Sequence, residues 1–410
     1  MKKLFALLLS LAMVLALVAC GQKDPTPDTP DTPDDPQTKV EYKVAMITDY
    51  GDITDQSFNQ TTYEACKAFA EDNSIEFSYF KPAGDNTADR VAMIEKAVDE
   101  GFNVIVMPGY AFGGAIVEAA PEFPDVKFIA LDVAASDLLE TAVAKAGEAY
   151  DYTPENWDLN KYVDMSNVYC AVYQEELCGY MAGYAAVKLG YKNLGFLGGM
   201  SVPAVVRYGY GFVQGVDAAA ADLGLTDVKL NYIYGGQFFG DADITAVMDT
   251  WYQGGTEVVF ACGGGIYTSA VDAAKKVGAK VIGVDVDQAG VIANYAGVDG
   301  MTVTSAMKGL YPATYDTLTD VIVNGNWEKY VGKIETLGLV SGTDPEANYV
   351  QIPMGDGTQW SDSFTQDDYK AMVKDMFDGK ITVSNNTSSD VSAADFATVI
   401  TVDDQGSIKG

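Results

Sequence analysis

Short apolar stretches and longer amphipathic stretches alternate along the chain from residue 44 onward. The apolar stretches predict strands and the amphipathic ones predict helices, because side chains repeat every two residues in a strand and every 3.6 in a helix. In the first part, strands are predicted at 44–48, 75–80, 104–107, 126–131 and 168–173, and helices at 57–70, 87–99 and 112–120. Residues 134–165 show weak periodicity and predict a loop region with at most short helices.

The same alternation continues after residue 173. Strands are predicted at 194–197, 229–234, 258–261, 281–284 and 301–305, and helices at 175–189, at 309–323 and between the strands. Two sets of βα units predict an α/β protein with two Rossmann-like lobes, each built on a parallel sheet. We assign 40–172 plus 291–325 to the first lobe and 173–290 plus 326–400 to the second, with chain crossings near 173, 290 and 326. The crevice between two such lobes is a natural ligand site.

The first 39 residues differ from the rest of the chain. Lys2 and Lys3 precede an apolar run that ends at Cys20, which is typical of a secretory signal peptide over 1–19 and is too short for a membrane-spanning helix. The ending Leu-Val-Ala-Cys resembles the lipobox of bacterial lipoproteins, in which this Cys is lipidated; the alternative is ordinary secretion with an incidental Cys. Residues 20–39 contain Pro, Thr and Asp but no aromatic or aliphatic side chain, so they predict a disordered tether. We expect a lipid-anchored protein at the extracytoplasmic face of the cell membrane.

Composition and charge narrow the classes of function. The sequence has 58 acidic and 26 basic residues, a formal charge of −32, and no His. The negative charge argues against nucleic-acid binding, which needs a basic surface. The lack of His removes His-based catalytic triads and His metal ligands. The Cys residues after Cys20 lie in apolar patterns without a CxxC pair, which favours buried thiols. We expect that the protein is not an enzyme and that it binds neither a metal nor a cofactor.

Carboxylates directly follow three of the predicted strands. Asp49 follows 44–48, Asp132 follows 126–131, and Asp285 follows 281–284. In open α/β sheets, ligands bind beyond the carboxyl ends of the strands. A carboxylate accepts hydrogen bonds from hydroxyl or ring N–H groups, and sugar hydroxyls are the obvious partners. The simpler interpretation is that each Asp caps a following turn or helix; for all three together, a ligand site is favoured.

The segment DYGDITDQSFNQ runs from the first of these strand ends into a helix. Ser57 and Gln60 fit a capping box at the start of that helix. Phe58 lies at the first helical position, followed by Asn59. Phe58 belongs either to the core or to a ligand site, where it would stack on a planar ring.

Two features farther along the chain point to the same crevice. Gly263, Gly264 and Gly265 follow a predicted strand and precede a helix, where bare backbone can approach a ligand closely. Lys308 follows the strand 301–305. It is expected either to pair with Asp285 and donate to a ligand hydroxyl, or to lie on the surface.

These motifs together resemble the basic membrane protein family of bacterial lipoproteins, the nucleoside-binding subunits of ABC transporters. The resemblance extends from about 44 to 340 and rests on DYG…DQSFN from Asp49, EELCGYMAG from Glu175, GFLGGM from Gly195 followed by Pro203 and Arg207, IGVDVDQ from Ile282, and SAMK ending at Lys308. The sequence departs from the family at Gln56, where the family has Lys, and in the loop GGGIYTSA, which lacks the usual G-x-G spacing.

The resemblance implies a type I periplasmic-binding-protein fold whose two lobes, joined by a three-strand hinge, close on a purine nucleoside. It implies that Phe58 stacks on the base, that Asp49 and Asn59 face the base or nearby sugar, that Asp132 addresses the base, that Asp285 and Lys308 hold the ribose hydroxyls, and that a backbone group near Gly265 contacts the ribose. A second aromatic side chain would cover the other face of the base. The candidates are Phe238, Phe260 and Tyr267, and we include Phe260 among the expected ligand-binding residues.

The family also implies partners and leaves alternatives. We expect a monomer that delivers its ligand to an ABC permease and ATPase on other chains. One alternative keeps the class and changes the ligand to a free sugar or another small ring compound. A second is a secreted nucleoside hydrolase, in which the Asp residues would act as acid and base or bind a metal. A third is a lipid-anchored signalling receptor, whose binding site would look the same.

Overall fold

Two β-sheets organise residues 41–409, the part of the chain that the computed structural model describes. The signal peptide, Cys20 and the tether predicted at 1–39 lie outside the described residues. The strand order of the first sheet is β11-β5-β4-β3-β1-β2, and all its pairs are parallel. The order of the second is β12-β10-β9-β8-β6-β7-β13, and only β12 is antiparallel to its neighbour. The predicted α/β class with two parallel sheets is confirmed.

The strands and helices alternate through both sheets. The first sheet and its helices comprise β1 (Lys43–Ile47), α1 (Phe58–Asn73), β2 (Glu76–Phe80), α2 (Thr87–Asp99), β3 (Val104–Pro108), α3 (Gly113–Ala119), β4 (Lys127–Leu131), α4 (Ala135–Lys145), α5 (Leu159–Tyr162), β5 (Val168–Tyr173), α11 (Leu310–Leu318) and β11 (Lys333–Leu337). The second comprises α6 (Glu175–Lys188), β6 (Asn193–Gly198), α7 (Pro203–Leu223), β7 (Lys229–Tyr234), α8 (Ala242–Gln253), β8 (Val258–Cys262), α9 (Tyr267–Val277), β9 (Lys280–Asp285), α10 (Ala289–Ala296), β10 (Thr302–Lys308), β12 (Val350–Gln351), α12 (Gln366–Phe377) and β13 (Thr401–Ser407).

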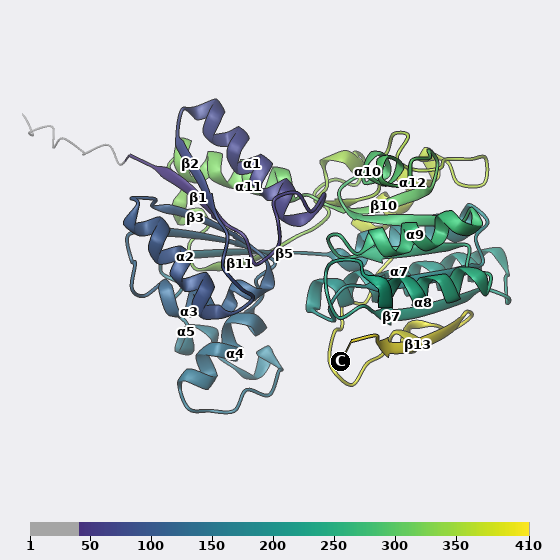
Figure 1. Ribbon diagram of the computed structural model, residues 1–410, viewed down its shortest axis with the longest axis horizontal. Helices are drawn as coiled ribbons and strands as arrows, with labels where there is room; N and C mark the ends of the chain where they lie inside the picture. The colour runs from purple at the N-terminus through teal and green to yellow at the C-terminus, as the bar shows by residue number, and fades with distance from the viewer. Residues whose placement is uncertain (1–40, 410) are drawn as a thin grey trace, which may run out of the picture. The chain divides into compact units, whose positions relative to one another are not determined.

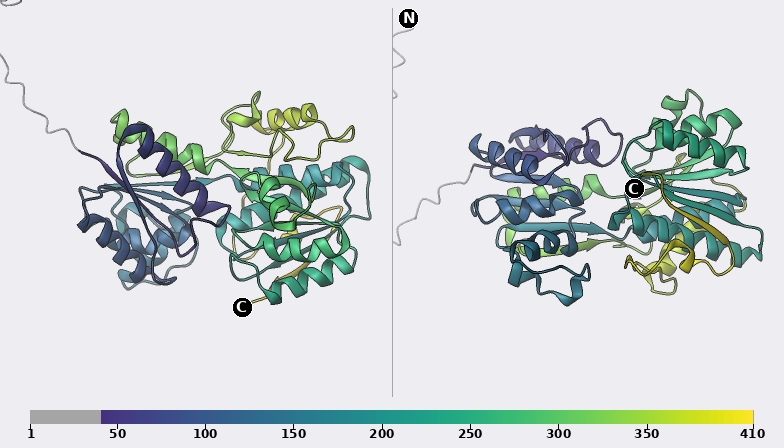
Figure 2. Two further views of the ribbon diagram at one scale, coloured as in Figure 1. Left: turned by 45° about the horizontal axis from the view of Figure 1, so that its top comes forward. Right: turned by 60° about the horizontal axis from the view of Figure 1, so that its bottom comes forward.

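Helices cover both faces of each sheet, as Figure 2 shows. In the first sheet, α1 and α11 lie side by side although they are far apart in sequence (Figure 1). The central strands are apolar and buried on both sides; β3, for example, is fully buried along its length. Such continuous burial is expected of parallel strands that lie between two helical layers.

The chain passes between the two sheets after Tyr173, Lys308 and Leu337. The predicted crossings near 290 and 326 were therefore wrong. Strand β10 pairs with β9, so 291–308 belongs with the second sheet and not with the first. Strand β11 pairs with β5, so 333–337 belongs with the first sheet. The apolar pattern of a strand is the same in either sheet, and only its pairing partner distinguishes them.

The region 134–165 contains more regular structure than predicted. Helix α4 occupies eleven of these residues, where at most short helices were expected. Its buried side chains are Leu138, Leu139, Ala142 and Val143, a spacing that places them on one helical face. The segment that follows α4 is polar and rich in turns, as the weak periodicity predicted.

Helix α6 starts the second lobe and lies unusually close to α7. A Cβ atom at Gly211 of α7 would lie 2.7 Å from Glu176 Cα in the first turn of α6. Nearly every residue of α6 is buried. This close packing fixes the first turn of α6, which carries the fully buried Glu175.

Candidate functional site

A cavity of about 440 Å³ lies at the carboxyl ends of the strands and takes its walls from both lobes. This volume falls in the range of small-molecule sites. Seven of the eight predicted ligand-binding residues line it: Asp49, Phe58, Asn59, Asp132, Gly265, Asp285 and Lys308. These residues lie together in the structure although they are up to 259 positions apart in sequence, from Asp49 to Lys308.

Lys308 lies at the centre of a buried ionic cluster. Its Nζ is 2.5 Å from Asp132 Oδ2, 3.4 Å from Glu175 Oε1 and 3.7 Å from Asp285 Oδ1. The side chain of Lys308 is only 3% exposed. The three carboxylates around it raise its pKa against the effect of burial, so Lys308 carries its charge. Its predicted pairing with Asp285 occurs at 3.7 Å, and Asp132 is its closest partner.

A second cation completes this cluster. Arg207 Nε donates to Glu175 Oε2 at 2.7 Å. The cluster thus holds three carboxylates and two cations. Burial raises the pKa of Asp132 to about 6, although the neighbouring Lys308 acts to lower it. Asp132 consequently takes up a proton at a higher pH than an ordinary aspartate does.

Asp285 is held by hydroxyl groups from both lobes. Ser57 Oγ donates to its Oδ2 at 2.5 Å, and Tyr208 OH donates to its Oδ1 at 3.2 Å. Ser57 therefore does not form the predicted capping box with Gln60, and its side chain makes no cap bond. Asp55 caps α1 instead, because its carboxylate accepts from the backbone N–H groups of Ser57, Asn59 and Gln60.

Two buried oxygen atoms in the cavity wall accept no hydrogen bond within residues 41–409. They are Oδ1 of Asn59 and Oδ1 of Asp132. A buried acceptor without a donor costs about 1–3 kcal/mol. Both atoms therefore favour a bound molecule that supplies hydroxyl or N–H donors. Asp49 lines the same wall, and burial raises its pKa although its carboxylate accepts from the N–H groups of Gly51 and Tyr50.

Phe58 and Phe238 provide aromatic surface in the cavity. The Nζ of Lys308 lies over the Phe58 ring, 4.7 Å from its centroid. Phe260, which we predicted as a ligand-binding residue, is not in the cavity wall. It is fully buried in the core of the second lobe and contacts Phe196 and Phe212. This prediction was wrong because Phe260 lies in the middle of β8, whereas the cavity begins at Cys262, the last residue of that strand.

The other aromatic candidate and the glycine loop have their own partners. Tyr267 packs edge-on against Tyr295 and lies outside the cavity wall. Gly265 lines the cavity, but its N–H donates to Phe238 O at 2.9 Å and its carbonyl accepts from Thr268. The backbone of Gly265 thus ties the loop that carries Phe238 to the start of α9.

Several residues of the site were not predicted from the sequence. Glu175 and Arg207 were noticed only as parts of motifs, without a role. Glu175 comes two positions after the strand that ends at Tyr173, so the strand-end argument, extended by one residue, would have identified it. Tyr208 gave no signal, because a tyrosine within an apolar helix is usually a core residue.

The cavity wall is acidic. It contains five carboxylates, Asp49, Asp52, Asp55, Asp132 and Asp285, and two lysines, Lys81 and Lys308. Both Asp132 and Asp285 have left-handed backbone conformations, with φ of 58° and 65°. Such conformations are uncommon outside glycine and occur often at functional sites. The arrangement suits a neutral, hydroxyl-rich ring compound better than an anion.

The chain is similar to several known proteins. The family model described as ABC transporter substrate-binding protein, PnrA-like, matches residues 42–343. The "ABC transporter nucleoside-binding protein BmpA" of Lactococcus lactis subsp. cremoris is 25% identical over 392 residues, which cover 92% of this chain and 96% of the relative. An "uncharacterized lipoprotein" of Pyrococcus abyssi is 25% identical, over 74% of this chain and 69% of the relative.

A solved solute-binding protein of an ABC transporter system from Aeropyrum pernix superposes with a TM-score of 0.59 at 20% identity, over 84% of this chain and 88% of that chain. This likeness confirms the predicted periplasmic-binding-protein fold of type I. Within residues 41–409, no helix combines the length and apolar character that crossing a bilayer requires.

Proposed function

Since the chain belongs to the PnrA-like (Bmp) family of ABC transporter substrate-binding proteins, we propose that it captures a purine nucleoside in the cavity and delivers it to a permease on another chain. The observation that carries the proposal is the combination of Phe58 with the unpartnered acceptors of Asn59 and Asp132. An aromatic platform suits a planar base, and acceptors suit ring N–H and ribose hydroxyl groups. The name of the Lactococcus relative, a nucleoside-binding protein, supports the same ligand class.

The proposed roles follow the geometry of the wall. Phe58 stacks on the base, and Asp49 and Asn59 face its polar edge or the nearby sugar. Asp132, Asp285 and Lys308 address the remaining hydroxyl or N–H groups. Phe238 replaces Phe260 as the second aromatic. Because these residues come from both lobes, the ligand would stabilise the closed arrangement by bridging them.

Closure is further supported by direct contacts between the lobes. Ser57 donates to Asp285, and Gln288 Nε2 donates to Gln56 O at 3.1 Å. We propose that a permease recognises this closed arrangement, and that the protein releases its ligand unchanged. Anchoring through a lipidated Cys20 would keep the protein near that permease.

Calorimetric titration with inosine, guanosine, adenosine and ribose tests the ligand. We expect at least one nucleoside to bind in the micromolar range or tighter, and ribose much more weakly. Ribose binding as tight as the best nucleoside would favour a sugar-binding protein. No binding of any nucleoside at millimolar concentration would refute the proposal. Chromatography after prolonged incubation with inosine separates binding from hydrolysis, since a hydrolase would release free base.

Phe58→Ala tests the stacking role, with Phe377→Ala as the control. Phe377 is 49% exposed at the end of α12 and does not line the cavity. Losing a stacked aromatic is expected to weaken binding about tenfold or more, from about 1 kcal/mol of ring stacking and the apolar contact that goes with it. Binding by Phe58→Ala as tight as that of the control variant would exclude the stacking role.

A further inference from the structure

The C-terminal strand β13 lies beside the loop that carries Phe238. It extends the second sheet by pairing in parallel with β7, from Thr401 opposite Lys229 to Ser407 opposite Tyr234. The pairing continues past the strand, because Ile408 N donates to Tyr234 O at 2.8 Å. Strand β7 leads directly into residues 235–240, which include both Phe238 and Phe239. The C-terminal segment therefore runs along the base of this loop.

Lys409 makes specific contacts with the loop. Its Nζ donates to Gln237 Oε1 at 2.8 Å and forms an ion pair with Asp241. Its side chain also covers Gly236, where an added Cβ atom would lie 2.7 Å from Lys409 Cβ. Gly236 has a φ of 80°, a backbone conformation that other residues rarely adopt. Lys409 thus holds the loop at Gly236, before Phe238, and at Asp241, after it.

The loop between these two points forms part of the cavity wall. Phe238 and Phe239 both line the cavity. The Phe238 ring lies against the glycine loop, since a Cβ at Gly263 would be 2.8 Å from its Cδ1. The backbone carbonyl of Phe238 accepts a hydrogen bond from the Gly265 N–H at 2.9 Å. A displacement of residues 236–240 would therefore move an aromatic wall and the start of α9 together.

We infer that the C-terminal segment 401–409 sets the position of the Phe238 wall, with Lys409 as a positioning residue for ligand affinity. Lys409 does not itself line the cavity, and it lies beyond residues 42–343, to which the family model matches. The inference rests on the proposed function only for the choice of ligand. The position of the loop can be measured without any ligand.

The test compares Lys409→Ala, Lys409→Arg and Asp241→Asn with Lys380→Ala. Asn retains the cap that Asp241 provides for α8, because Asn caps helices as well as Asp does. Lys380 forms an exposed pair with Asp375, 2.6 Å away, outside the cavity. Two quantities are measured on the full chain: amide hydrogen exchange of residues 236–240 and Gly265 without ligand, and affinity for inosine.

We expect Lys409→Ala to raise the exchange rates at these amides and to weaken inosine binding about two- to fivefold, as suits a partly exposed ion pair. Lys409→Arg should restore both quantities. The double variant Lys409→Ala, Asp241→Asn should bind inosine no more weakly than the weaker-binding single variant does, because both substitutions act through one contact. In 1 M salt, where the screening length is about 3 Å, the difference should shrink.

Three outcomes would overturn the inference: exchange rates equal to those of Lys380→Ala, faster exchange with unchanged affinity, or no rescue by Arg. If the wild-type protein binds none of the nucleosides, the proposed function fails instead. The exchange comparison then still decides whether Lys409 holds the loop.

Discussion

Replacing Lys308 by Met removes one cation from a buried group of three carboxylates. Lys308 contacts Asp132, Glu175 and Asp285, and these side chains are 11%, 0% and 7% exposed. In the wild-type protein, Lys308 and Arg207 leave the cluster with a surplus of one negative charge. In the variant only Arg207 remains, and the surplus becomes two. Met fills a similar volume, so the change is chiefly one of charge.

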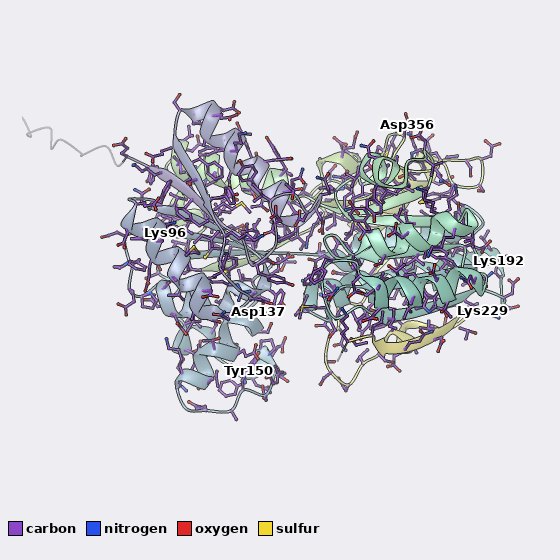
Figure 3. All side chains as sticks on the ribbon, in the orientation of Figure 1. Lys96, Asp137, Tyr150, Lys192, Lys229 and Asp356 are labelled. Carbon is purple, nitrogen blue, oxygen red and sulfur yellow. The ribbon has the colours of Figure 1, made fainter. Side chains whose placement is uncertain are left out.

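The expected loss follows from this burial. Removing one partner from a buried ion pair costs about 3–5 kcal/mol, since it leaves a charge that is neither solvated nor paired. We expect the free energy of unfolding of Lys308→Met to fall by this amount at pH 7.5. Lys192→Met is the matched control. Lys192 lies at the periphery (Figure 3) and pairs with Asp227, and their side chains are 41% and 65% exposed. Such an exposed pair contributes at most about 1 kcal/mol.

The loss of stability in Lys308→Met should depend on pH, and the direction of that dependence can be predicted. A carboxyl group whose pKa is raised by folding stabilises the protein below its unfolded pKa, and this contribution is lost as the pH rises through the folded pKa. For Asp132 in the wild-type protein, that window runs from the ordinary value of 3.8 to about 6. Without Lys308 the pKa of Asp132 rises further, because the Lys308 charge acts to lower it. The deficit of the variant should therefore shrink between pH 7.5 and pH 5, as the surplus charge is neutralised.

Urea unfolding followed by circular dichroism at both pH values measures this deficit. Each variant is compared with the wild-type protein at the same pH, so that the general effect of acid cancels. The reasoning would be refuted if Lys308→Met lost no more stability than Lys192→Met at pH 7.5. A deficit that grew on acidification would also refute it, because neutralising the carboxylates must relieve their repulsion.

Three further predictions follow from the site and the core. Phe260→Ala should lower the free energy of unfolding by about 3–5 kcal/mol, as for other buried aromatics, measured by urea unfolding; a variant as stable as wild type would contradict its place in the core. Inosine 5′-monophosphate should bind at least tenfold more weakly than inosine, because the wall has five carboxylates and two lysines; equal affinities in calorimetry would contradict this. Inosine affinity should fall as the pH drops through about 6, where Asp132 takes up a proton and stops accepting from the ligand. Asp132→Asn should bind weakly at every pH, and an unchanged pH profile in that variant would assign the effect to another group.

The fold was predictable from local sequence patterns, except where the pairing of distant strands decides which sheet a strand joins. The alternation of strands and helices specified two parallel sheets. It could not show that β10 pairs with β9 and β11 with β5, since both strands look alike in sequence whichever sheet they join. Helix α4 is different: the buried spacing of Leu138, Leu139, Ala142 and Val143 was visible in the sequence, and the polar residues around it obscured the signal.

The site was predictable as far as it follows from the ends of strands. Asp49, Asp132, Asp285 and Lys308 lie where a parallel sheet presents its carboxyl edge, so position in the sequence implied position in space. The bond from Ser57 to Asp285 spans 228 residues, and no local pattern predicts it. The prediction that Phe260 binds the ligand was wrong for a different reason. An aromatic inside a strand looks the same whether it faces a ligand or the core, and only the packing of Phe260 against β6 and α7 decides.

The two lobes contribute to the ionic cluster from equivalent positions. The first sheet contains the run β2-β1-β3-β4-β5, and the second contains the matching run β7-β6-β8-β9-β10. Asp132 directly follows β4 and Asp285 ends its counterpart β9, both in left-handed backbone conformations. Each sheet thus presents one carboxylate at the same place, and Lys308 of the second lobe lies between them.

This arrangement bears on how closure depends on the ligand. If the lobes separate in the unliganded protein, as proposed, Lys308 stays with Glu175 and Asp285, while Asp132 stays with the first lobe. Closing then requires Asp132 to give up water, and a buried ion pair repays that cost only when the remaining lone pairs are also satisfied. In the closed arrangement Asp132 Oδ2 has Lys308, but Oδ1 has no donor within the described chain. A ligand that donates to Oδ1 supplies the missing hydrogen bond. We therefore expect the ionic cluster alone to stabilise the closed arrangement only in part, and a ligand hydroxyl or N–H group to supply the rest.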